Sequence, residues 1–203
     1  MSQEYYDVRD FHLRFGLPCP ETPVLAVERH VQVFRVKFLY EETLEYLTAL
    51  DTKDLPAQAD ALVDLSYVSI GTGLFLGADS IGWATCPPPS PSACPALADQ
   101  SGWAFGEEVL WQLHVLFYRL NRQETMTANI LLRDLHRLTL TQASRQRLPW
   151  GALWAEVQRA NMAKVRVEAP AGSKRKSRFD VVKPADWVGP DIVGVLRAHG
   201  WEG

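Results

Sequence analysis

Cysteine is scarce in this sequence, and the few cysteines follow no binding pattern. Cys19, Cys86 and Cys94 occur without a C-x-x-C motif and without a histidine at finger-like spacing. Structural zinc sites use paired ligands, and disulfide frameworks use an even set of cysteines. We therefore expect three reduced thiols, with neither a zinc site nor a disulfide framework.

Long apolar runs and a marked excess of charge are missing as well. No run approaches the roughly 20 apolar residues that span a bilayer, and the N-terminus lacks the basic and apolar regions of a signal peptide. Lys and Arg total 21 against 24 for Asp and Glu, which gives a net charge of -3. This balance favours neither a membrane nor a nucleic-acid polymer as partner, and we expect a cytoplasmic protein.

Two familiar ligand-binding signatures are also absent. The sequence has neither a G-x-x-x-x-G-K-[ST] phosphate loop nor a kinase-type glycine loop. A di-iron helical protein would need Glu-x-x-His pairs, and none of the five histidines follows an acid at that spacing. A bound phosphate would therefore have to be held by metal and side chains.

Helical periodicity is what the sequence does have. With 47% hydrophobic residues, we expect one all-α domain over residues 1–203, built as an antiparallel helical bundle. Helices are predicted at residues 7–17, 27–50 and 56–76, and another begins after Pro149. Residues 78–148 form an insertion of a proline-rich loop and two amphipathic helices, and residues 169–203 form a basic loop and tail. The second inserted helix is expected to turn these residues inward: Ile130, Leu131, Leu135 and Leu138.

Acidic residues continue the apolar stripes of the second and third predicted helices. The residues that share a stripe at helical spacing are Phe34, Phe38, Glu41 and Glu45 on one helix and Asp60, Asp64, Tyr67 and Gly71 on the other. The short connection makes these helices antiparallel neighbours, so both acid pairs reach one level. A single E-x-x-E is usually a solvated face. Two inward pairs instead favour a hard cation, magnesium or manganese.

Polar residues later in the chain supply candidate partners for an anion. Asn161 and Lys164 interrupt the apolar face of the helix after Pro149. The basic loop at residues 172–183 could be a solvated turn, but near a metal site it offers cations to an anion that the metal also holds. His12 could reach a ligand or simply pack, and Trp187 could stack on a base or simply pack. Together these features predict a polyanionic, metal-chelated ligand, most simply a nucleoside triphosphate.

Three motifs resemble the MazG-type all-α nucleoside triphosphate pyrophosphohydrolases. They are Glu41-Glu42-x-x-Glu45, Asp60-x-x-x-Asp64-Leu65-x-Tyr67-Val68-x-x-Gly71-Thr72, and Ala160-Asn161-Met162-Ala163-Lys164-Val165. The similarity covers most of residues 5–77 and 150–196, and its closest branch resembles phosphoribosyl-ATP pyrophosphohydrolase and is common in phages. Two departures stand out: Ala61 replaces the usual Glu of the second acidic motif, and the insertion at residues 78–148 is longer than the usual link.

The resemblance implies cleavage between the α- and β-phosphates to a monophosphate and pyrophosphate. Glu42, Glu45 and Asp64 would hold magnesium, while Glu41, the candidate general base, and Asp60 would complete a further ion or orient water. The catalytic set is thus Glu41, Glu42, Glu45 and Asp64, with Asp60 added for metal, and roughly two or three Mg²⁺ ions are expected per site, with Mn²⁺ as a substitute. The candidate substrate-binding set is His12, Arg35, Lys37, Tyr67, Asn161, Lys164, Lys174, Arg175, Lys176, Lys183 and Trp187.

The resemblance leaves the substrate and the assembly partly open. A deoxypurine triphosphate, particularly dGTP, is the first expectation, and dUTP or dCTP is the alternative. A non-catalytic metal or nucleotide sensor would keep the acids but bind without turnover. The resemblance also implies a homodimer or tetramer, and a phage-encoded protein would act on the nucleotide pool of the host cytoplasm.

Overall fold

A computed structural model describes residues 2–78, 82–83, 102–167, 170–172 and 175–203. Its elements are α1 (Gln3–Arg14), α2 (Arg29–Asp51), α3 (Leu55–Phe75), α5 (Gly102–Asn121), α6 (Thr125–Arg145), α7 (Trp150–Met162) and α8 (Ile192–Ala198), with β1 (Val165–Arg166), β2 (Val181–Val182) and a 3-10 turn at Pro170–Gly172. The expected all-α bundle is confirmed, since the strands form only a two-residue antiparallel pair. Cys86, Cys94, Lys174 and the proline-rich stretch lie outside the described residues.

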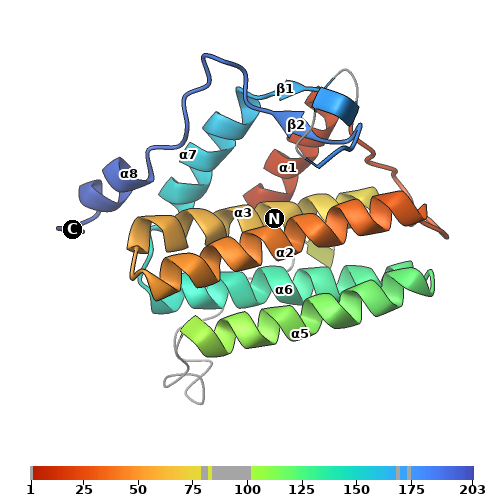
Figure 1. Ribbon diagram of the computed structural model, residues 1–203, viewed down its shortest axis with the longest axis horizontal. Helices are drawn as coiled ribbons and strands as arrows, with labels where there is room; N and C mark the ends of the chain where they lie inside the picture. Colours follow the sequence, from red (N-terminus) through yellow and green to blue (C-terminus); the bar gives the residue numbers. More distant parts are fainter. Residues whose placement is uncertain (1, 79–81, 84–101, 168–169, 173–174) are drawn as a thin grey trace.

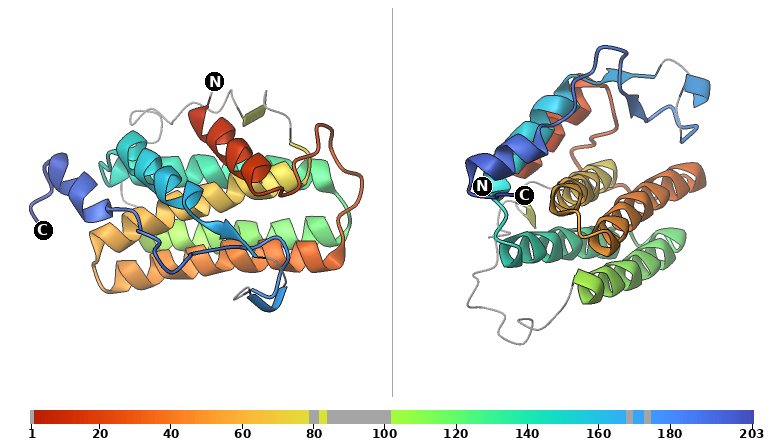
Figure 2. Two further views of the ribbon diagram at one scale, coloured as in Figure 1. Left: turned by 90° about the horizontal axis from the view of Figure 1, so that it is seen from above. Right: turned by 60° about the vertical axis from the view of Figure 1, so that its left-hand side comes forward.

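Four helices form the main bundle. α2 and α3 lie above α5 and α6, and the end-on view shows the four helices as two stacked pairs (Figures 1 and 2). The insertion therefore supplies half of the bundle. Its apolar stripe is almost completely buried, at Val109, Leu113, Leu116 and Leu120 of α5 and Leu132 and Leu135 of α6. Ile130 corrects one expectation, because it points outward with 49% of its surface exposed.

α3 is the central helix of the molecule. Asp54 caps its first turn by accepting a hydrogen bond from the backbone N–H of Ala57 at 3.0 Å, and Pro56 suits that turn because it needs no N–H partner there. The helix packs against α2 and α6, and on its other side against α1, α7 and α8. Leu62, Leu65 and Ile70 have no exposed surface, because neighbouring helices cover α3 on several sides.

The remaining helices form a second layer that leans over α3. α1 and α7 lie side by side above α3, and the chain after α7 returns through β1 and β2 (Figures 1 and 2). Two indole N–H groups of α7 tie the layer together, because Trp150 donates to Glu4 at 3.2 Å and Trp154 donates to Asp7 at 2.8 Å. This layer and the loop before β2 make one wall of a pocket whose other wall is α2 and α3. Among the described helices, none combines the length and the apolar character needed to cross a membrane.

Candidate active site

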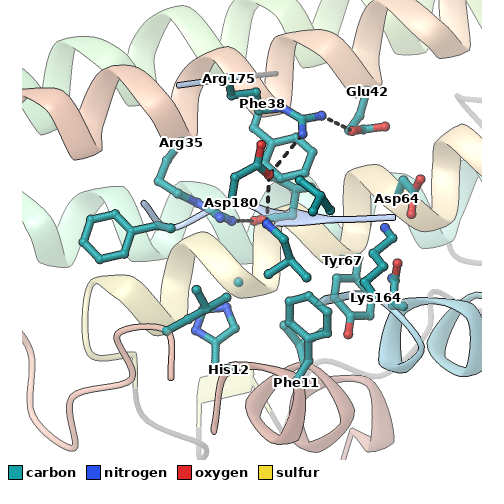
Figure 3. A pocket seen from close by; sticks show the side chains of 18 of the residues that line it. Phe11, His12, Arg35, Phe38, Glu42, Asp64, Tyr67, Lys164, Arg175 and Asp180 are labelled. Atoms are coloured by element: carbon teal, nitrogen blue, oxygen red, sulfur yellow. Dashed lines mark hydrogen bonds and ion pairs between the residues drawn. The ribbon is translucent and has the colours of Figure 1, made fainter. Parts of the chain in front are cut away.

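The pocket between the two layers is a cavity of about 370 Å³. Side chains from α1, α2, α3, α7 and residues 175–183 line it. Figure 3 shows Glu42, Asp64 and Lys164 toward one end, and His12 and Arg35 toward the other. Its size lies within the range of cavities that bury small-molecule ligands.

Carboxylates define the first end of the pocket. Glu42 is 4% exposed, and Glu45 and Asp64 line the cavity with it. Burial, together with the charges of Asp64 and Glu45, raises the pKa of Glu42 to about 9. Burial also raises the pKa of Asp64. These acids therefore lie in a poorly solvated place, where the nearby protein cations do not bring the pKa of Glu42 or Asp64 back to its ordinary value.

Asp60 is a neighbour of these acids, and its carboxyl group is also hard to ionise. Asp60 lines a neighbouring groove together with Glu45. Burial, with the charges of Asp64 and Glu45, raises the pKa of Asp60 to about 7. Its Oδ1 atom is buried and has no hydrogen-bond partner among the described residues, which is unusual for a buried carboxylate oxygen.

Three cations face these acids. Arg175 donates from Nε to the carboxylate of Glu41, and its Nη2 atom lies 3.9 Å from the carboxylate of Glu42. Its Nη1 atom donates to Asp180 at 3.3 Å. The guanidinium also stacks on Phe38, 3.7 Å from the centre of the ring. The positive charges of Lys164 and Lys183 each favour the ionised form of Asp64 and so lower its pKa. Burial lowers the pKa of Lys164, although Asp64 works against that shift. The end of the pocket is thus rich in both signs of charge.

The donor set fits a hard divalent cation by its chemistry. The ligands would be carboxylate oxygens, Asp60 offers an unpartnered buried oxygen, and the raised pKa values of Glu42 and Asp60 mark negative charge that a cation would stabilise. The positions of the side chains are a different matter. Within the described parts of the chain, no three Asp, Glu, His or Cys side chains are close enough to hold a metal ion, and Glu41 is paired with Arg175 instead.

The segment that supplies the acids of this pocket matches a known family. Residues 8–79 match the family model described as phosphoribosyl-ATP pyrophosphohydrolase. This segment belongs to the MazG-like all-α NTP pyrophosphohydrolase superfamily. It spans most of α1 and all of α2 and α3. Searches of curated proteins and of solved structures found no match.

In the segment that matches this family model and in the chain that follows it, most of the expected residues meet in one place. The candidates that line the cavity are His12, Arg35, Glu42, Glu45, Asp64, Tyr67, Asn161, Lys164, Arg175 and Lys183. Glu41 and Asp60 lie next to the cavity without lining it. The acids are not arranged as their spacing suggested, because Glu42 is the buried member of its motif while Glu45 is exposed outside its contact with the pocket.

Three other candidates lie away from the cavity. Lys37 is exposed on α2, and Lys176 is exposed in the loop before β2, so the structure brings neither to the acids. Trp187 packs on the end of α7, where its indole N–H donates to the carbonyl of Ala160 at 2.7 Å. The ammonium groups of Lys183 and Lys164 lie 4.3 Å and 5.7 Å from the centre of its ring, so Trp187 supports these lysines.

The sequence interpretation missed several residues of the pocket. Asp180 is 3% exposed and accepts from Arg175, yet nothing in the pattern of the basic loop distinguished it. Phe11 and Phe38 also line the cavity, although helical spacing placed Phe38 only on an apolar stripe. Their roles depend on which helices meet, and no local signal in the sequence carries that information.

Proposed function

We propose that the protein is a metal-dependent nucleoside triphosphate pyrophosphohydrolase that releases pyrophosphate and a nucleoside monophosphate, with a deoxypurine triphosphate such as dGTP as the first candidate substrate. The observation that carries the proposal is the meeting of Glu42, Glu45 and Asp64 with Lys164, Lys183 and Arg175 in one cavity. Acids alone would suit a bare cation. Acids facing cations suit a metal-chelated polyanion.

Each group has a role in this proposal. Glu42, Glu45, Asp60 and Asp64 would hold Mg²⁺ or Mn²⁺, and a bound ion would neutralise phosphate charge and lower the pKa of a bound water. Lys164 and Lys183 would bind phosphate oxygens, with Asn161 beside them. The charges of both ammonium groups act on Asp64 and lower its pKa, which supports a position for the two lysines close to the acids and thus to a metal-chelated polyanion.

Arg175 connects binding to the candidate general base. In the structure its guanidinium donates a hydrogen bond to the carboxylate of Glu41. Glu41 can accept a proton from an attacking water only when that guanidinium has another partner, and substrate phosphates offer one with a better matched geometry. In this proposal, Arg175 therefore keeps Glu41 paired until the polyanion arrives.

The pairing of Glu41 with Arg175 also favours a second candidate function. A nucleotide sensor would keep the ion pair, bind its ligand at the same cavity and release no product. The two functions differ in turnover alone, so one assay separates them.

The test is pyrophosphate release from ribo- and deoxyribonucleoside triphosphates in Mg²⁺, Mn²⁺ or EDTA, with chromatographic separation of the products. We expect monophosphate plus pyrophosphate in metal only, and a loss of at least about a hundredfold in Asp64→Asn or Glu45→Gln. The matched control is Glu107→Gln, an exposed position on α5. Full turnover in Asp64→Asn would refute the proposal, and binding without turnover in the unmodified protein would establish the sensor.

Self-association is part of the same proposal. The outer faces of α2, α5 and α6 carry large exposed apolar side chains: Leu44, Trp111, Tyr118 and Met126, each with more than half of its surface exposed. We propose a homodimer or tetramer, and a single species of monomer mass in sedimentation at micromolar concentration would contradict it.

A further inference from the structure

The end of the pocket away from the acids holds a polar pair that the proposed chemistry leaves unused. His12 of α1 is 2% exposed and Arg35 of α2 is 5% exposed, yet both line the cavity. Phe11 and Phe38 lie beside them (Figure 3). An apolar slot with a few oriented polar groups is the usual form of a site that recognises a flat ligand.

His12 is held as an acceptor. Its Nδ1 atom lies 2.8 Å from the carbonyl oxygen of Pro18, and because a carbonyl only accepts, Nδ1 carries the hydrogen. Burial and the charge of Arg35 lower the pKa of His12 to about 3, so the ring is neutral at pH 7. Nε2 therefore presents a lone pair, and no side chain or backbone group of the described residues donates to it.

Arg35 is held as a donor. Its Nε donates to Thr72 at 3.0 Å and its Nη2 donates to the carbonyl of Val68 at 2.8 Å. The guanidinium also stacks 4.9 Å from the centre of the Phe75 ring. A guanidinium has five N–H groups, so these contacts fix its position and leave further donors free to meet a ligand.

Gly71 of α3 is the point where the acceptor and the donor meet. A Cβ atom at this position would lie 3.0 Å from His12 Nε2 and 3.1 Å from Arg35 Nη2. Nε2 of His12 and Nη2 of Arg35 therefore both lie beside the same small space, which the Cβ atom of any larger residue at position 71 would occupy. A lone buried His or Arg could be structural, but here an acceptor and a donor both lie close to one point beside the cavity, within reach of one ligand edge.

We propose that this pair selects nucleobases with an adjacent ring N–H and exocyclic carbonyl, the ring N–H donating to His12 Nε2 and the carbonyl oxygen accepting from Arg35. Guanine, hypoxanthine, uracil and thymine carry that edge. Adenine and cytosine, in the same orientation, set an amino group against Arg35 and a lone pair against His12. Sites that hydrogen-bond a base edge discriminate strongly, since a mismatched base leaves buried groups unpaired. The inference rests on the proposed function, because it names which triphosphates the site accepts.

The first test compares purines with purines and pyrimidines with pyrimidines, so that differences in how well the base fits the pocket by size do not affect the result. We expect kcat/KM to be at least about tenfold higher for dGTP and dITP than for dATP, and for dUTP than for dCTP. Equal values within both sets would overturn the inference. Titration calorimetry with dGMP and dAMP gives a readout that needs no turnover. If no triphosphate is hydrolysed, the proposed function fails, and tighter binding of dGMP than of dAMP still supports base selection while equal binding refutes it.

Two variants test the residues, each with a matched control. His12→Gln places an amide that can turn to donate or accept, so the dGTP to dATP ratio should fall toward one, whereas exposed His199→Gln should leave the ratio unchanged. Gly71→Ala places a methyl group between the two polar atoms and should weaken dGMP binding at least about tenfold. Gly151→Ala, with nothing within 4 Å of its Cβ, is its control. If His12→Gln fails to fold, Gly71→Ala decides, and unchanged dGMP binding in a folded Gly71→Ala protein overturns the inference.

Discussion

Replacing Glu42 with Gln should change how the stability of the protein depends on pH. In the folded protein, burial and the charges of Asp64 and Glu45 raise the pKa of Glu42 to about 9, from a reference value of 4.5. Below the reference value the carboxyl is protonated in both states. Between the two values only the unfolded state releases the proton, so the folded state binds about one proton more and stability falls as the pH rises.

The size of the effect follows from one proton. The free energy of unfolding should fall by about 1.4 kcal/mol for each pH unit between the two pKa values, which amounts to about 2.7 kcal/mol from pH 6 to pH 8. Glu42 is only 4% exposed, so solvent screening reduces this little. For a chain of this length the loss corresponds to a fall in Tm of about 5–10 °C. Gln keeps the volume of the side chain but cannot ionise, so the variant should lose this slope.

The assay is thermal or urea unfolding from pH 6 to pH 8 in EDTA, with Glu107→Gln as the exposed control. We expect Glu42→Gln to be more stable than the unmodified protein at pH 8 and to show the flatter curve, while the control runs parallel to the unmodified protein. Parallel curves for Glu42→Gln would refute the reasoning. Adding Mg²⁺ at pH 8 should then stabilise the unmodified protein more than the variant, since a bound cation favours the ionised carboxylate.

Three further predictions concern packing, a buried hydrogen bond and the phosphate site. Leu113→Ala removes a side chain with no exposed surface and should lower the free energy of unfolding by about 3 kcal/mol in urea titrations; a change below about 1 kcal/mol would mean that α5 is not part of the core. Tyr46→Phe removes the hydroxyl that accepts a hydrogen bond from Gln142 at 2.9 Å, and it should lower the free energy of unfolding by about 1–2 kcal/mol in urea titrations. Unchanged stability would contradict this prediction. Lys164→Met should lower kcat/KM for pyrophosphate release by about a hundredfold, whereas exposed Lys37→Met should not, and equal effects of the two would remove Lys164 from the phosphate site.

The positions of the second and third helices were well predicted because their signals are local, whereas the first helix begins and ends earlier than expected and α8 was not predicted. The second and third helices, expected at residues 27–50 and 56–76, occur at Arg29–Asp51 and Leu55–Phe75. Periodic apolar residues mark their length, while Asp54 and Pro56 mark the boundary between them by capping chemistry that acts within one turn. The two inserted helices were found for the same reason.

The burial of individual acids was predicted less well. Helical spacing put Glu41 and Glu45 on the stripe of Phe34, but the buried acid is Glu42. α2 is covered by both α3 and α5, so its buried surface is wider than one stripe, and spacing alone cannot say which edge of that surface lines the pocket. Ile130 was misplaced because it lies on the face of α6 opposite the buried residues Leu132 and Leu135, and it is 49% exposed.

The sequence was sufficient for the helices, the acidic motifs and the superfamily of residues 8–79, because each depends on residues within a few turns of one another. The pocket itself required the folded chain. Arg175 reaches Glu41 across 134 positions of sequence, and His12 meets Arg35 over Gly71 because α1 packs on α3 beside α2. Such meetings are set by how the layers pack, and the same helices placed differently would keep every motif and lose the site.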